Sequence, residues 1–291
     1  MIDAATILAM DVAAAAQRLK GVVRKTPLTL SAPLSKRYGC NVYLKREDLQ
    51  VVRSYKLRGA YNLMSTLPQS VLERGVVCAS AGNHAQGFAY SCKRLRVKGV
   101  VFMPVITPQQ KVQQTKTFGE GFIDIKLVGD SFDDCAAAAQ AYTAAHNLTF
   151  VPPFDDYRIM EGQATVGMEI LEEGIPIDFL LMPIGGGGLS AGVGSYFKTF
   201  SPNTTIIGLE PQGAPSMQAA LEAGGPVSLN SIDRFVDGAA VKRMGDLTFP
   251  ICKAVLDEVY SVAEGKICTS ILRLYNEEAI VVEPAGALAI A

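Results

Sequence analysis

The sequence predicts an α/β fold in two domains, with parallel sheets flanked by helices. Its 291 residues suit two domains of the usual size, roughly 150 residues each. Hydrophobic residues make up 49% and charged residues 19%, which supplies a buried core and excludes a disordered or collagen-like chain. Short β-branched runs alternate with helical segments along much of the chain, and this alternation is typical of parallel sheets.

Each expected strand is a short apolar run followed by a helix-like segment. This order requires crossover helices, which cover both faces of a parallel sheet. The helix after the second run has clear end signals, because Thr107 and Pro108 precede it and Gly119 follows it. The six runs cover residues 76–80, 99–104, 124–128, 148–151, 177–184 and 204–210.

Two interruptions of this alternation predict where the chain passes from one domain to the other. One falls near Asp48–Arg53 and the other at Pro152–Tyr157. We therefore expect a smaller α/β domain of residues 49–152. A larger, discontinuous domain would comprise residues 1–48 and 153–291.

Charge and hydropathy exclude several classes of partner. Lysine and arginine number 27 against 28 acidic residues, so a net charge of -1 offers no field for nucleic acid. No apolar run reaches the length of about 18 residues that a membrane span needs. Residues 1–20 have the pattern of an amphipathic helix and not of a signal peptide. We expect a cytoplasmic protein.

The six cysteines support a reducing compartment. They lie far apart, and no CxxC pair suggests a zinc or disulfide framework. We expect most of them to be small buried side chains. They are Cys40, Cys78, Cys92, Cys135, Cys252 and Cys268.

Four consecutive glycines, Gly185–Gly188, join a buried strand to a helix that begins at about Leu189. Glycine permits positive φ and close approach of a ligand to the backbone. The helix N-terminus adds unpaired N–H groups and the positive end of the helix dipole. The segment therefore predicts a phosphate-binding loop, and the alternative is a tightly packed or flexible turn.

The same segment also fits a dinucleotide-binding pattern. Gly186, Gly188 and Ala191 match GxGxxA, and Glu210 ends the next expected strand about where a ribose-binding acid would lie. On these residues alone, a nicotinamide or flavin dinucleotide remains an alternative to a simple phosphate ligand.

A hydrolase is excluded by the order of residues. Gly188, Ser190 and Gly192 match the GxSxG pattern of a nucleophilic serine, which requires a histidine later in the chain. The two histidines of the sequence, His84 and His146, both precede this serine.

Lys56 is the lysine most suited to covalent chemistry. Tyr55 and Leu57 flank it with apolar surface, and an amine in apolar surroundings loses its proton easily, as a Schiff-base lysine must. The alternative is an ordinary solvated lysine on a helix.

A second anion-binding turn is expected at ASAGNHAQG, residues 79–87, again between a strand and a helix. Its small residues leave backbone N–H groups available to a carboxylate, and Asn83 and His84 add polar side chains. The alternative for His84 is a packing or capping role. Two anion sites and one reactive lysine together indicate a small zwitterionic substrate.

Four motifs in register carry a family resemblance. SYKLRGAYN, ASAGNHAQG, PIGGGGL and VEPAGALA, in this order, resemble the fold type II pyridoxal-phosphate enzymes, which share the tryptophan synthase β-like fold. They are most similar to the threonine dehydratases, also called threonine deaminases. Residues 235–249, FVDGAAVKRMGDLTF, resemble the biosynthetic branch of that family.

The resemblance implies a role for individual residues. Lys56 corresponds to the lysine that binds the aldehyde of pyridoxal 5'-phosphate, and Asn83 to the asparagine that contacts its ring hydroxyl. Glu283 corresponds to a glutamate near the cofactor ring. The phosphate loop corresponds to Gly185, Gly186, Gly187, Gly188 and Leu189. The turn that holds the substrate carboxylate corresponds to Ser80, Ala81, Gly82, Asn83 and His84.

The resemblance also implies an activity. This is β-elimination of water from L-threonine and L-serine, which turns threonine into 2-oxobutanoate and ammonia in the first step of isoleucine biosynthesis. A dinucleotide enzyme would give no reason for Lys56 or the second anion site. The family further implies a homodimer or homotetramer.

Two alternatives to this activity follow from the same comparison. One is an enzyme like serine racemase or serine dehydratase; racemases carry a serine where this chain has Ala81, and a methyl group cannot deliver a proton. The other is a non-catalytic amino-acid-binding fragment. No metal is expected, because Ser216 stands where cation-binding relatives carry an acid.

The sequence ends at Ala291, whereas the family continues with a glycine-rich turn whose serine or cysteine contacts the pyridine nitrogen. Biosynthetic members continue further with a regulatory domain that senses isoleucine and valine. We therefore expect the 291 residues to be a fragment of such a chain.

Overall fold

The computed structural model describes residues 10–291, which form two compact units. The smaller unit comprises residues 13–24 and 50–153, and the larger unit comprises residues 10–12, 25–49 and 154–291. The unit boundaries at 49/50 and 153/154 lie beside the expected crossings. Residues 13–24, which we expected in the larger domain, cluster with the smaller unit. They contain most of α2 (Val12–Leu19), the described part of the expected N-terminal helix.

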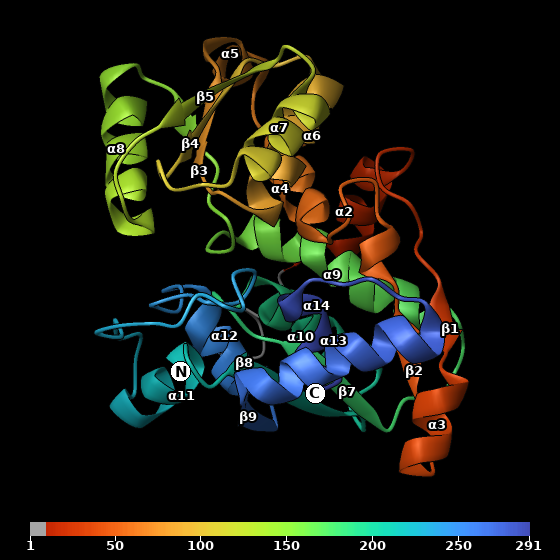
Figure 1. The fold of residues 1–291 in the computed structure, drawn as a ribbon. Helices are drawn as coiled ribbons and strands as arrows, with labels where there is room; N and C mark the ends of the chain where they lie inside the picture. The colour runs from red at the N-terminus through yellow and green to blue at the C-terminus, as the bar shows by residue number, and fades with distance from the viewer. Residues whose placement is uncertain (1–9) are drawn as a thin grey trace. The chain divides into compact units, whose positions relative to one another are not determined.

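The smaller unit contains a parallel sheet of four strands in the order β5-β4-β3-β6 (Figure 1). All four lie at sites where the sequence predicts a strand. Val76 in the central strand pairs with Gly99 on one side and with Thr149 on the other. The strands are β3 (Val76–Ala79), β4 (Gly99–Met103), β5 (Ile123–Leu127) and β6 (Thr149–Phe150).

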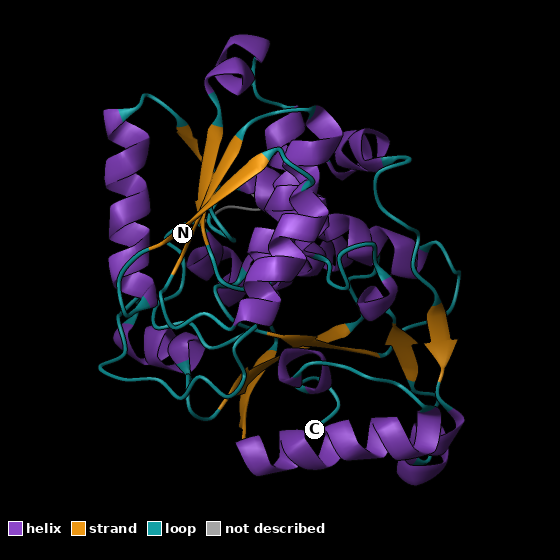
Figure 2. Cartoon of the chain, turned by 45° about the horizontal axis from the view of Figure 1, so that its top comes forward, coloured by secondary structure: helices purple, strands orange, loops and turns teal. Residues whose placement is uncertain are grey.

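Helices cover both faces of this sheet, as the alternation predicts (Figures 1 and 2). The helix α8 packs on one face through Cys135 and Ala139, which contact Val77 and Phe102 of the sheet. The crossover helices α6 and α7 lie on the other face, because the chain reverses its direction of travel across the sheet only after β5. The helices of this unit are α4 (Lys56–Ser65), α5 (Gln69–Arg74), α6 (Asn83–Leu95), α7 (Gln109–Gly119) and α8 (Phe132–Ala145).

The predicted ends of α7 are close to those observed. The helix begins at Gln109, directly after Pro108, and the Thr107 hydroxyl donates to the carbonyl of Pro104 at 2.7 Å and does not cap the helix. The left-handed position that closes the helix is Glu120, with φ 39°, one residue beyond Gly119.

The larger unit contains a parallel sheet of three strands in the order β7-β8-β9. The first two, β7 (Phe179–Pro183) and β8 (Thr205–Pro211), lie within or next to predicted runs. The third, β9 (Glu258–Val262), was not predicted. A separate antiparallel pair of β1 (Leu28–Leu30) and β2 (Tyr43–Lys45) was also not predicted.

Two hydrophobic clusters lie against this sheet. One gathers side chains such as Met160, Ala191 and Met217 from α9, α10, α11 and α12. The other joins Leu209 of β8 to Ile267 of α13 and to α14. The helices of the larger unit are α3 (Ala32–Tyr38), α9 (Tyr157–Leu171), α10 (Gly188–Phe200), α11 (Ser216–Ala223), α12 (Thr248–Val255), α13 (Glu264–Glu278) and α14 (Pro284–Ala287), with a 3-10 turn at Glu47–Leu49.

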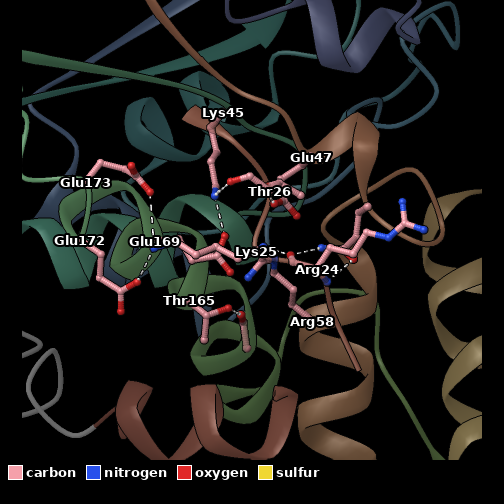
Figure 3. A network of polar contacts seen from close by, with 12 residues as sticks. Arg24, Lys25, Thr26, Lys45, Glu47, Arg58, Thr165, Glu169, Glu172 and Glu173 are labelled. Atoms are coloured by element: carbon pink, nitrogen blue, oxygen red, sulfur yellow. Dashed lines mark hydrogen bonds and ion pairs between the residues drawn. The ribbon is translucent and has the colours of Figure 1, made fainter. Parts of the chain in front are cut away.

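Polar contacts join residues 25–49 to the helix α9 within the larger unit (Figure 3). The Lys45 ammonium lies 2.5 Å from the Glu169 carboxylate and donates to the Thr26 carbonyl at 2.7 Å. Both charged side chains are nearly buried, with exposed fractions of 10% and 13%. Lys25 forms a more exposed pair with Glu172.

Within residues 10–291, none of the helices combines the length and the apolar character that crossing a bilayer requires.

Candidate active site

The chemistry-bearing residues of the smaller unit gather where the strand order reverses. The chain leaves β3 toward β4 but returns from β5 to β6 on the other side of β3, so the segments after β3 and β6 diverge there. Such a switch point at the carboxyl ends of parallel strands is where open α/β sheets bind ligands. The turn of residues 80–82 follows β3, and residues 151–153 follow β6.

Lys56 is the first residue of α4 and lies against this switch point. Its Nζ donates to the carbonyl of Pro153 at 2.9 Å and lies 5.6 Å from the centre of the Tyr55 ring. The side chain is half-buried, and the next residue, Leu57, is fully buried. The amine thus contacts a carbonyl oxygen and lies near one aromatic ring, on a side chain that is only half-buried.

Gly87 brings α6 close to the start of α4. A Cβ atom at this position would lie 2.9 Å from the Leu57 nitrogen and 3.0 Å from the Lys56 carbonyl carbon. These distances are shorter than real Cβ contacts, so only glycine fits without moving the backbone around Lys56. The contact fixes Lys56 relative to the turn at the start of α6.

The turn after β3 has the features of an anion site. The helix α6 begins at Asn83 after Gly82, and no side chain caps the helix. The Ser80 hydroxyl accepts the Gly82 N–H at 3.2 Å. Ser80, Ala81, Gly82 and Asn83 are all half-buried, so a ligand can reach their backbone. The first N–H groups of the helix, with its positive dipole end, favour a carboxylate here.

His84 faces inward from this turn. Its side chain is 3% exposed, and Nε2 lies 2.9 Å from the Val151 carbonyl. Burial, together with the nearby Lys56 charge, lowers the pKa of the ring to about 3. The ring is therefore neutral, with its proton on Nε2, because a carbonyl can only accept. His84 can offer its backbone to a ligand, while its side chain holds the segment that follows β6.

The glycine loop lies in the larger unit, between β7 and α10. Gly187 precedes the helix in the left-handed region, with φ 91°, and no side chain caps the helix. The first N–H groups of α10 have no acceptor within the helix. The loop therefore presents donors at a positive dipole end, and Leu189 lies in the first turn.

Close packing also requires the glycines. A Cβ atom on Gly186 would lie 2.3 Å from the Phe154 ring, and one on Gly188 would lie 2.9 Å from the Phe154 Cβ. A Cβ atom on Gly187 would lie 2.7 Å from the Met244 side chain. These contacts show the close packing that the tight-turn interpretation requires, and the loop also lies at the N-terminus of α10, as the phosphate-loop interpretation requires.

Glu210 caps a helix and does not bind a ribose, as it would in a dinucleotide site. Its side chain is 1% exposed, and its two oxygens accept the N–H groups of Met217 and Gln218 at 2.8 and 2.9 Å. The carboxylate thus caps α11 and is not available to a ribose. Burial raises the pKa of Glu210 to about 7, although the two N–H groups act in the opposite direction.

Glu283 precedes α14 and is exposed. Its Oε1 would lie 3.0 Å from a Cβ atom on Gly238, so the carboxylate lies against the 235–249 segment. Among residues 10–291, no three His, Cys, Asp or Glu side chains form a group suited to a metal ion.

The expected site residues thus form two sets, one in each unit. The smaller unit brings Lys56 and the turn of residues 80–84 together around residues 151–153. The larger unit holds residues 185–189 and Glu283. Sequence reasoning missed Phe154 and Thr248, which contact the glycine loop. The break at residues 152–157 was the available signal for Phe154, and Thr248 lies in the segment 235–249 that carries the resemblance to the biosynthetic branch.

Comparison with known proteins agrees with these features. Residues 19–291 match the family model described as "Pyridoxal-phosphate dependent enzyme". The chain is 55% identical to a protein named "L-threonine dehydratase biosynthetic IlvA" from Halalkalibacterium halodurans, over 97% of this chain and 68% of that protein. It is also 55% identical to the protein of the same name from Bacillus subtilis, over 94% of this chain and 65% of that protein. The chain thus spans about two thirds of these relatives.

Solved structures of similar fold agree with the sequence comparison. The processed form of threonine deaminase isoform 2 from Solanum lycopersicum is 43% identical, with a TM-score of 0.90, over 98% of this chain and 80% of that one. Serine racemase from Dictyostelium discoideum is 29% identical, with a TM-score of 0.87, over 96% of this chain and 87% of that one. The expected fold type II architecture is confirmed, and the chain belongs to the pyridoxal-phosphate dependent enzyme family.

Proposed function

We propose that this chain carries out the deamination of L-threonine, and of L-serine, by β-elimination of water. The products from threonine are 2-oxobutanoate and ammonia, in the first step of isoleucine biosynthesis. The observation that carries this proposal is the placement of Lys56 beside an anion-binding turn at the switch point of the smaller unit. The similarity to proteins named threonine dehydratase and threonine deaminase supports the choice of substrate.

The residues of the chain fit pyridoxal 5'-phosphate. The glycine loop offers amides at the N-terminus of α10, and side chains at Gly186 and Gly187 would collide with Phe154 and Met244. This arrangement suits a phosphate group. Lys56 supplies the amine for the aldehyde, Asn83 the contact for the ring hydroxyl, and Glu283 lies in the unit that holds the loop.

When it is bound, the cofactor supplies an electron sink that stabilises negative charge at the substrate α-carbon. The turn of residues 80–84 binds and orients the substrate carboxylate through its backbone. Lys56 then removes the α-proton from the substrate as a general base. Loss of the β-hydroxyl as water leaves an enamine, which hydrolyses to the 2-oxo acid and ammonia.

The backbone around Lys56 determines where its amine lies. The Pro153 carbonyl accepts its hydrogen bond, and His84 holds the same segment through Val151. With its pKa lowered to about 3, the His84 ring is too weak a base to compete with Lys56 for the substrate proton. L-serine should also react, because a single methyl group in an apolar pocket changes the barrier by only about 1–3 kcal/mol.

The proposal extends to the assembly and location of the protein. We propose a homodimer or homotetramer, which sedimentation should detect as two or four times the 31.0 kDa chain mass. We also propose a cytoplasmic location, and the six free cysteines, four of them buried, are typical of a reducing compartment.

The first prediction tests Lys56. Borohydride reduction of the purified protein, followed by peptide mass mapping, should find a pyridoxyl adduct on the peptide that contains Lys56. The Lys56→Ala variant should lose the adduct and lower turnover of L-threonine to 2-oxobutanoate by about 10²–10⁴-fold or more, because the general base is gone. Lys253→Ala, which changes an exposed lysine, is the matched control. An adduct on another lysine, or none after incubation with the cofactor, would refute the proposal.

A further inference from the structure

The N-terminal half of α12 lies against two carbonyl groups of the glycine loop. The Thr248 hydroxyl donates to the Gly186 carbonyl at 2.5 Å, and the Cys252 thiol donates to the Gly187 carbonyl at 3.4 Å. Both side chains are fully buried. Two consecutive peptide groups of the loop are therefore held from the same helix.

These contacts determine which way the amides of the loop point. In a planar trans peptide, the carbonyl of one residue and the N–H of the next point in opposite directions. Because the carbonyls of Gly186 and Gly187 face α12, the N–H groups of Gly187 and Gly188 point away from it. The Gly187 carbonyl also accepts the Ala191 N–H at 2.8 Å, which begins the hydrogen bonding of α10. The loop amides are thus aligned with the N-terminus of α10.

The Asp155 carboxylate holds the N-terminus of α12 in place. Its Oδ1 accepts the N–H groups of Leu247 and Thr248 at 2.9 and 3.1 Å, and its Oδ2 accepts that of Asp246 at 3.0 Å. A Cβ atom on Gly245 would lie 2.2 Å from the same carboxylate, so glycine is needed for this approach. Asp155 acts as the cap that α12 lacks locally, since no side chain of its own segment caps it.

We propose that Thr248 is a positioning residue for the phosphate group of the cofactor, and that Asp155 positions Thr248. This inference rests on the proposed function, because it assumes that the glycine loop binds pyridoxal phosphate. Thr248 does not touch the phosphate. It holds the Gly186 peptide so that the neighbouring amides are already aimed when the ligand arrives, which lowers the cost of ordering the loop on binding.

The Thr248→Val variant tests this role with little change in shape. Valine keeps the branched side chain but leaves the buried Gly186 carbonyl without its hydroxyl donor. The peptide can then turn, and the amides lose their alignment. The Thr248→Ser variant keeps the hydroxyl and is the matched control.

The measurement compares two ligands that differ only by the phosphate. Equilibrium dialysis of the apoprotein gives dissociation constants for pyridoxal 5'-phosphate and for pyridoxal. We expect Thr248→Val to weaken binding of the phosphate form about tenfold or more, and to change pyridoxal binding by less than about twofold. Thr248→Ser should bind both ligands nearly as the wild type does. The ³¹P resonance of the bound cofactor should shift in the valine variant only.

Two results would overturn the inference. One is an equal loss of affinity for both ligands, which indicates a general effect on the fold. The other is no loss for either ligand. If circular dichroism shows that Thr248→Val does not fold, Asp155→Asn takes its place. This variant replaces one of the two acceptor oxygens, and it should also lose affinity for pyridoxal 5'-phosphate but not for pyridoxal. Wild-type protein that binds pyridoxal phosphate no better than pyridoxal would instead refute the proposed function, before any variant is compared.

Discussion

Glu210 is a buried acid whose protonation depends on the folded state. Its pKa is raised from the ordinary value of 4.5 to about 7, chiefly by burial. A raised acid pKa means that the folded state binds the proton more tightly than the unfolded chain does. The contribution of this group to stability is therefore fully present below about pH 4.5 and is lost as the pH rises through about 7.

The second prediction follows from this pKa. In the Glu210→Gln variant the group no longer titrates, so the unfolding free energy of the wild type relative to the variant should fall between pH 4.5 and 7. The slope is at most about 1.4 kcal/mol per pH unit. Urea denaturation of both proteins at several pH values measures it, and other titrating groups cancel in the difference. Parallel stability curves would contradict the raised pKa.

Residue identity alone could single out candidate positions, but not the direction in which each side chain points. Lys56 could be singled out by its apolar neighbours in sequence, and the small residues of the turn by their place between a strand and a helix; both remain predictions. The inward direction of His84 could not be predicted, because it depends on the Val151 carbonyl, 67 residues later. Likewise, Glu210 fitted a ribose-binding pattern until the structure showed it capping α11.

At the scale of elements, α9 and α10 approach through glycine. A Cβ atom on Gly192 would lie 2.2 Å from the backbone oxygen of Met160, whereas one on Gly167 would meet the Val193 side chain at 3.1 Å. A backbone atom cannot move without shifting the helix, while a side chain can adjust. The two glycines therefore form a matched pair on one helix interface.

The third prediction compares the two alanine variants. Alanine favours a helix by about 1 kcal/mol over glycine, but overpacking at Gly192 should outweigh this and lower the unfolding free energy by about 1–3 kcal/mol. Gly167→Ala should lie within about 1 kcal/mol of the wild type. Guanidinium denaturation midpoints at an unchanged slope measure both. Equal effects of the two substitutions would contradict the packing that the structure shows.

Most of the elements that were predicted share one property, namely an apolar run with a following helix. The strand β9 lacks such a run, since its alternating EVYSV leaves Glu258 and Tyr260 exposed. The pair of β1 and β2 is only three residues long on each side. Pairing with distant segments determines such strands, so local sequence carries little signal for them.

At the scale of the whole molecule, cofactor binding should stabilise the protein, which is the fourth prediction. A ligand that binds only the folded state adds about 2.7 kcal/mol at a free concentration of 100 times its dissociation constant. The thermal midpoint of the apoprotein should therefore rise by several degrees when pyridoxal phosphate is added. Differential scanning calorimetry measures the shift, and Lys56→Ala should show a smaller one. An unchanged midpoint in the wild type would count against binding.

The overall architecture could be predicted because the strand and helix alternation extends over most of the chain. The residues that hold the glycine loop in place could not be predicted. Phe154 and Asp155 reach it from the break between two predicted elements, and Thr248 reaches it from a helix 62 residues after Gly186. No short motif joins these residues, so only the folded chain reveals that they act on one loop.

The larger unit is interrupted in sequence, and this affects the order in which the protein can fold. Lys45 and Glu169, which form its nearly buried ion pair, are 124 residues apart. Residues 50–153 between them are nearly all of the smaller unit. If that unit folds first, it closes most of the intervening loop and reduces the entropy cost of the pairing. During synthesis, the antiparallel pair of β1 and β2 leaves the ribosome long before α9 and α13 exist, and an isolated two-stranded pair is marginally stable. The nascent chain should therefore hold residues 25–49 unfolded until α9 and α13 have been made, and this is the period in which a chaperone would be needed.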